Sequence, residues 1–137
     1  MSKIEKKAPP AFIFGKRPEF VEATVKFPLP DGEEAAVNAK FAYRTRTEFG
    51  ALWDEVAAAS QELAKPVEGE EITYAGLMGK GNQANAQNIL KYLKAWEGVP
   101  VELNEANLTQ LLDEAPAAAN AFWDAYRTAI LSGRSGN

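Results

Sequence analysis

The chain has 137 residues and a formal net charge of −4, from 15 basic and 19 acidic side chains. This length suits one domain, and no apolar run approaches the ~20 residues that a transmembrane helix requires. Without cysteine or histidine, the chain has no disulfide, no thiol nucleophile, and neither the commonest metal ligand nor the commonest general base.

We predict that the first 18 residues form an N-terminal arm that is flexible in part. Pro9 and Pro10 disfavour regular structure, and the arm lacks the pattern of a secretion signal, so we expect a cytosolic protein that does not associate with membranes. The arm holds an apolar cluster that can add a strand or fill a groove: Phe12, Ile13 and Phe14. Its basic residues can touch nucleic acid, but the acidic total favours a solvated terminus and no nucleic-acid partner.

Two runs of alternating residues predict an antiparallel hairpin. In residues 21–27 and 37–43 the apolar side chains occupy every second position, which gives each strand one apolar face. Residues 30–32 read Pro-Asp-Gly, a turn sequence. Because two strands alone are marginally stable in water, we expect helices to cover this hairpin.

A helix is predicted from Thr45 to Lys65, directly after the hairpin. Thr45 and Glu48 have the spacing of a capping box, in which each side chain binds a free backbone N–H at the helix start. The helix carries one apolar stripe, which we expect to face the hairpin: Phe49, Leu52, Trp53, Val56 and Leu63. Pro66 is expected to stop it.

Residues 67–81 predict a flexible linker between helices. Gly76, Gly79 and Gly81 beside Lys80 suggest a phosphate-binding loop, but the spacing G-x-x-x-x-G-K-[ST] is absent and no apolar strand leads into the segment.

Three more helices are expected in the C-terminal half. The first spans residues 82–96, the second begins at an N-cap Asn104 and ends at Ala115, and the third runs from Pro116 to Ser132. Residues 134–137 are expected to fray. The prediction is therefore one α+β domain, residues 19–133, with an N-terminal antiparallel hairpin, a possible third short strand, and about four helices.

Carboxylates are the remaining catalytic option. Glu33–Glu34, Glu70–Glu71 and Asp113–Glu114 are adjacent in sequence, so within each pair the side chains point to different sides of a strand or helix. Solvated charge is the better interpretation, and we predict no catalytic, cofactor or metal site.

The aromatic residues divide into two groups. Trp53 and Tyr126 lie inside helical stripes and are expected in the core. Trp96 and Trp123 lie at the margins of their stripes, and together with Tyr92 they are the predicted partner-binding residues. We expect Trp96→Ala to weaken partner binding more than it lowers thermal stability.

The segment from Val25 to Trp53 resembles the tail assembly chaperones of long-tailed bacteriophages in its sequence, VKFPLPDGEEAAVNAKFAYRTRTEFGALW. In that family a strand, a P-D-G turn and a second strand lead into an R-T-R-T-E-[FY] helix start. The C-terminal part is also similar, in the segment from Trp96 to Gly98, the leucine pair before Pro116, and an aromatic final helix containing Tyr126.

The resemblance implies a non-catalytic assembly factor in the host cytoplasm. Such a protein binds the tape measure protein, keeps it soluble, helps recruit the major tail tube protein, and leaves the finished tail; it can also form a homo-oligomer. Two alternatives remain open. One is a minor structural tail or connector protein retained in the virion, and the other is an enzyme that uses carboxylates.

Overall fold

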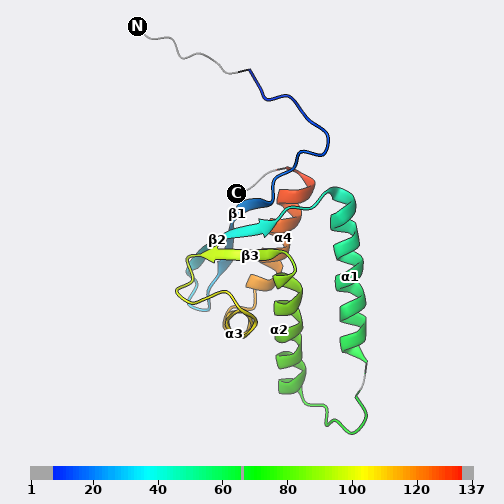
Figure 1. The fold of residues 1–137 in the computed structure, drawn as a ribbon. Helices are drawn as coiled ribbons and strands as arrows, with labels where there is room; N and C mark the ends of the chain where they lie inside the picture. The colour runs from blue at the N-terminus through cyan, green and yellow to red at the C-terminus, as the bar shows by residue number, and fades with distance from the viewer. Residues whose placement is uncertain (1–7, 66, 134–137) are drawn as a thin grey trace.

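The computed structural model describes residues 8–65 and 67–133, which form a three-stranded antiparallel sheet and four helices (Figure 1). In chain order the elements are β1 (Phe20–Pro28), β2 (Glu34–Ala42), α1 (Arg46–Ala64), α2 (Tyr74–Leu90), β3 (Leu93–Glu97), α3 (Glu105–Glu114) and α4 (Ala118–Leu131). The predicted α+β class is confirmed. Residues 1–7 of the predicted arm, the predicted helix stop Pro66 and the predicted frayed end 134–137 lie outside the described residues.

The hairpin forms as its alternation predicts. β1 pairs with β2 in an antiparallel register that places Val25 opposite Val37 and Ala23 opposite Ala39. All four side chains are buried on one face, and the polar residues between them lie on the other. The sheet order is β1-β2-β3, so β2 is central and the hairpin needs one more strand and the helices to complete it.

That third strand is not the one proposed from the arm. Phe12 and Phe14 are 85% and 91% exposed and belong to no strand. The third strand is β3, within the stretch predicted as the end of a helix, so the predicted helix 82–96 is wrong in its last part. β2 has an edge of free backbone groups, and residues after Leu90 satisfy it: Tyr92 O accepts from Ala42 N at 2.8 Å, and β3 pairs antiparallel beyond it.

α2 begins inside the segment predicted as a flexible linker, which corrects that prediction. Thr73 caps the helix, since its hydroxyl accepts from Gly76 N at 3.0 Å. The glycines predicted to break regular structure, Gly76, Gly79 and Gly81, lie within the first half of the helix. α2 packs against α3 and α4, and its buried residues, Ala86 and Ile89, lie in its second half, so the glycine-containing first turns extend an anchored helix into solvent.

The core lies between the inner face of the sheet and the helices, with α4 laid across β1. Its largest fully buried side chains include Phe41, Tyr92, Phe122 and Tyr126. The assignment of Tyr126 to the core is therefore confirmed. The predicted caps of α1 at Thr45 and of α3 at Asn104 are confirmed too.

α1 is held mainly through its first two turns. Phe49 and Leu52 are its buried residues, whereas Trp53 is 50% exposed and Leu63 is 44% exposed. The assignment of Trp53 to the core is wrong, because α1 runs beside α2 away from the sheet (Figure 1), and past Leu52 no described residue of α1 is buried.

Two glycine substitutions should act in opposite directions. Gly79 lies in an exposed turn of α2 with open space around a built Cβ, so Gly79→Ala should raise the free energy of unfolding by about 0.5–1 kcal/mol. Gly98 has a φ of +100°, and a Cβ there would lie 2.8 Å from Ala36 O. Gly98→Ala should therefore lower the free energy of unfolding by more than about 1 kcal/mol. Urea unfolding of both variants measures the contrast, and a stabilising Gly98→Ala would contradict the structure.

Candidate functional site

An aromatic cluster extends from the core to the surface where α1, α2 and α4 meet. Tyr92 stacks on Tyr126 with ring centroids 4.4 Å apart, and the ring of Trp123 lies 5.7 Å from that of Tyr92. Trp53 meets Trp123 edge to face at 5.6 Å. Exposure rises outward, from buried Tyr92 through half-buried Trp123 to half-exposed Trp53. The outer end of the cluster is an apolar surface on a rigid support.

A hollow of about 250 Å³ opens beside this outer end, between α1, α2 and α4. Its apolar wall consists of Trp53, Val56, Ile89, Tyr92, Ala119 and Trp123. The polar residues that line it are uncharged: Ser60, Asn85, Asn88 and Asn120. Amide and hydroxyl groups can donate or accept, so they can adapt to the polar margin of a bound segment. We call this hollow the aromatic groove.

The structure brings together two of the three predicted partner-binding residues. Tyr92 and Trp123 both line the aromatic groove, although Tyr92 is only 1% exposed and forms its wall. Trp53 joins them as the most exposed aromatic of the groove, and our sequence reasoning missed it. One indication was available: Ala59 and Ser60 interrupt the stripe of α1 between Val56 and Leu63, so the stripe lacks large apolar residues there.

Trp96 lies elsewhere, on β3 opposite Ala39. It is half-buried against the core, and its Nε1 donates to Val101 O at 3.0 Å. This bond holds the loop between β3 and α3 against the sheet. A second apolar hollow, of about 480 Å³, lies beside that loop and is lined by Leu29, Val101, Leu111 and their neighbours.

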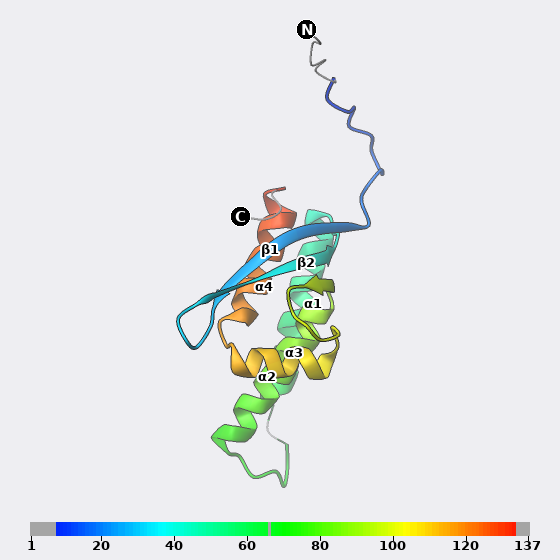
Figure 2. The ribbon, with the colours of Figure 1, turned by 90° about the vertical axis from the view of Figure 1, so that its left-hand side faces the viewer.

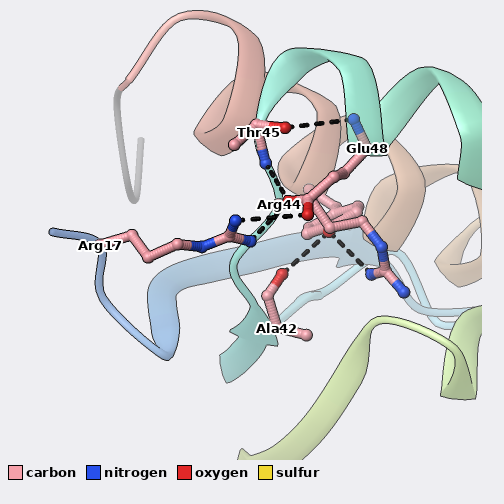
Figure 3. A network of polar contacts seen from close by, with 6 residues as sticks. Arg17, Ala42, Arg44, Thr45 and Glu48 are labelled. Atoms are coloured by element: carbon pink, nitrogen blue, oxygen red, sulfur yellow. Dashed lines mark hydrogen bonds and ion pairs between the residues drawn. The ribbon is translucent and has the colours of Figure 1, made fainter. Parts of the chain in front are cut away.

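Polar contacts at the end of β2 hold the groove's inner wall in place (Figure 3). Tyr126 Oη donates to Ala42 O at 2.9 Å and accepts from Arg44 Nη1 at 3.0 Å. Arg44 Nη2 also donates to Lys91 O, at the end of α2, at 3.2 Å. Burial raises the pKa of Tyr126, against the opposing effect of Arg44. One arginine therefore links α2, α4 and β2 directly behind the aromatic groove.

The start of α1 is fixed by the capping box and by the arm. Glu48 N donates to Thr45 Oγ1 at 3.2 Å, and Thr45 N donates to Glu48 Oε1 at 2.9 Å. Arg17 forms a two-pronged ion pair with Glu48, and its guanidinium lies 5.0 Å from the ring centre of Tyr43 (Figure 3). Hydrogen bonds from Arg17 and from the Thr45 backbone lower the pKa of Glu48 to about 2.

Within residues 8–65 and 67–133 we find no group of three metal-ligating side chains. No helix of that part of the chain is long and apolar enough to cross a bilayer. The aromatic groove thus offers surface for binding, and nothing in it has the arrangement of an acid, a base and a nucleophile.

Comparison with known proteins identifies the family. A sequence model described as phage tail assembly chaperone matches residues 1–137, the whole chain. The chain belongs to the phage tail assembly chaperone family. No curated protein and no solved structure matches it. Membership in this family indicates a non-enzymatic role and implies interaction with other tail proteins.

The ion pair at the base of the arm should make the stability of this chaperone depend on pH. The pKa of Glu48 is lowered in the folded state, so its contribution is present above its unfolded value of about 4.5 and is lost as the pH falls toward about 2. Glu48→Gln keeps an acceptor for Thr45 N but loses the charge. We expect its melting temperature to fall less between about pH 5 and pH 2 than that of the wild type.

Glu22→Gln is the matched control, since Glu22 makes no ion pair with any described residue. The assignment of the pH dependence to Glu48 would be contradicted if the melting temperature of Glu48→Gln fell with pH as much as that of the wild type, while Glu22→Gln changed this dependence.

Proposed function

We propose that this chaperone binds the tape measure protein through the aromatic groove, keeps it soluble, and helps to recruit tail tube subunits around it. The observation that supports this most directly is the half-exposed Trp53, backed by Trp123 beside an open hollow. Exposed aromatic anchors on a rigid support commonly dominate binding energy at interfaces.

The shape of the site favours a helical client. α1 and α2 lie side by side, and past Leu52 no residue of α1 is buried (Figure 1). α2 has 17 residues and is therefore about 25 Å long. A client helix laid along the two would bury Trp53 and Val56 and complete a three-helix arrangement, as an amphipathic helix does in an apolar groove.

The same surface suits temporary binding. The groove is small, and its polar margin of Asn85, Asn88 and Asn120 stays solvated when the client leaves. The chaperone can then act before the tail is complete and be absent from it, with no covalent step. This proposal places the protein in the host cytoplasm, where tails assemble, without a catalytic or nucleic-acid-binding role.

Truncation of Trp53 tests the groove. Trp53→Ala should weaken binding to the tape measure protein by about tenfold or more. Because half of the side chain is already in water, the free energy of unfolding should fall by only about 1 kcal/mol. Co-expression followed by co-purification gives the yield of complex and of soluble client, and urea unfolding gives the stability.

Val101→Ser is the matched control, because Val101 is also 50% exposed and lies beside the second hollow. Loss of client binding with Val101→Ser and not with Trp53→Ala would move the site to that hollow. Absence of co-purification and of any gain in client solubility with the wild type would refute the proposed function as a whole.

The alternative of a minor tail or connector protein retained in the virion makes a different prediction about composition. If the chain is a chaperone, mass spectrometry of purified virions should detect the tape measure protein and should not detect this chain. Its presence at a fixed number of copies per particle would favour the structural alternative.

Trp96 remains a predicted partner-binding residue and is tested separately. Trp96→Ala should weaken client binding more than it lowers thermal stability if the residue serves the partner. The hydrogen bond to Val101 O and the half-buried ring predict a loss of about 2 kcal/mol in stability. Trp96→Phe separates the two effects, since it keeps most of the ring contact and removes the donor. If Trp96→Ala simply unfolds the protein, the residue is structural.

A further inference from the structure

We propose that the N-terminal arm of one copy docks into the distal end of the α1–α2 hairpin of a second copy, so that the chaperone associates head to tail. The arm element is the apolar triplet of Phe12, Ile13 and Phe14. The receiving site, which we call the distal pocket, lies where α1 ends and α2 begins.

Among the residues that the structure describes, the triplet is not packed against the hydrophobic core. Phe12 and Phe14 are 85% and 91% exposed, Ile13 is 53% exposed, and the two rings touch each other with centroids 5.4 Å apart. Two nearly bare aromatic rings side by side form an apolar patch that a solvated terminus does not require. Such a patch marks a contact with another molecule.

The distal pocket is an open space of about 150 Å³ with an apolar part and a charged part, the latter formed by Lys65, Glu70, Glu71 and Lys80. Its apolar lining includes Leu63, Val67, Ile72 and Leu77, each 44% or more exposed. An apolar cavity of this size accepts a benzene ring. One phenylalanine of the arm can therefore enter the pocket while the other covers the exposed apolar side chains at its margin.

Charge distinguishes the two surfaces. Residues 1–17 hold five basic residues against one acidic residue: Lys3, Lys6, Lys7, Lys16 and Arg17 against Glu5. Residues 51–90, which include the distal pocket, hold six acidic residues against two basic ones: Asp54, Glu55, Glu62, Glu68, Glu70 and Glu71 against Lys65 and Lys80. The two segments thus carry formal charges of +4 and −4, which is the complementarity that guides association.

Acidic groups next to the pocket are available for pairing. Lys80 pairs with Glu70, and Lys65 pairs with Glu62 at 3.0 Å. No basic side chain among the described residues lies within ion-pair distance of Glu68 or Glu71. In the sequence, basic residues flank the triplet on both sides, so a docked arm brings opposite charges to these two carboxylates.

The arm cannot reach the distal pocket of its own molecule while Arg17 is held to Glu48. Phe14 lies three residues from Arg17, a span of about 10 Å, and Phe12 lies five residues away, about 17 Å when extended. Leu63, at the near side of the pocket, lies 15 residues along the helix from Glu48, about 22 Å. The described part of the arm also leaves the molecule at the end opposite to the α1–α2 connection (Figures 1 and 2).

The resulting interface is heterologous, because each copy contributes an arm at one end and a pocket at the other. Such contacts form chains or closed rings, depending on the rotation between copies. The distal pocket and the aromatic groove share no lining residue, and both lie along the α1–α2 hairpin.

Sedimentation velocity of the full-length protein over a range of concentrations tests the inference. The wild type should associate with increasing concentration, and less so at high salt, because the charge attraction is screened. The arm variant Phe12→Ser/Phe14→Ser and the pocket variant Leu63→Ser/Leu77→Ser should each associate at least tenfold more weakly. Val101→Ser, a change at a half-exposed apolar residue outside both surfaces, should behave as the wild type.

Mixing the two defective variants provides the decisive measurement. The arm variant retains an intact pocket and the pocket variant retains an intact arm, so together they should form a 1:1 complex and nothing longer. If the pocket variant fails to fold by circular dichroism, Glu68→Lys/Glu71→Lys replaces it. A monomeric wild type, an arm variant that associates normally, or a mixture without a complex would each overturn the inference.

Discussion

The structure depends on the direct passage from β2 into α1 at residues 42–46. Ala42 uses both backbone groups there: its N–H donates to Tyr92 O and its C=O accepts from Tyr126 Oη. Three residues later Thr45 caps α1. The strand's end, the end of α2 and the middle of α4 are thereby fixed at one point, and the direction of α1 follows from it.

This constraint explains why an apolar surface remains exposed. α1 leaves the sheet at the angle set by its cap, and only Phe49 and Leu52 in its first turns become buried. Beyond them the helix runs beside α2 without a third helix to cover both. Leaving Trp53 and Leu63 in water forgoes the stabilisation that their burial would provide. The proposed binding of a client helix would use this surface, and the aromatic cluster behind Trp53 keeps it in a defined shape.

The distribution of charge adds a second level of organisation. The formal charges of the basic arm and of residues 51–90, +4 and −4, cancel, so the net charge of −4 comes from the rest of the chain. Arg17 joins these two parts of one molecule through Glu48, at the base of the arm. An acidic total favours solubility, while the two ends of the molecule carry opposite local charges, as the proposed association of two copies requires.

Local signals in the sequence determined much of the fold. The alternation in β1 and β2, the capping box at Thr45 and the N-cap at Asn104 all act within a few residues, so they could be recognised without the structure. They were sufficient for the fold class. The positions of aromatic residues on the helical stripes suggested Trp123, together with Tyr92, as a candidate. Tertiary structure alone decided β3, since Leu93–Glu97 becomes a strand to satisfy the free edge of β2. It also decided α2, which is anchored by the packing of Ala86 and Ile89 in its second half. The exposure of Trp53 was decided in the same way, because a stripe shows which residues can be buried and only the neighbouring helices decide which ones are.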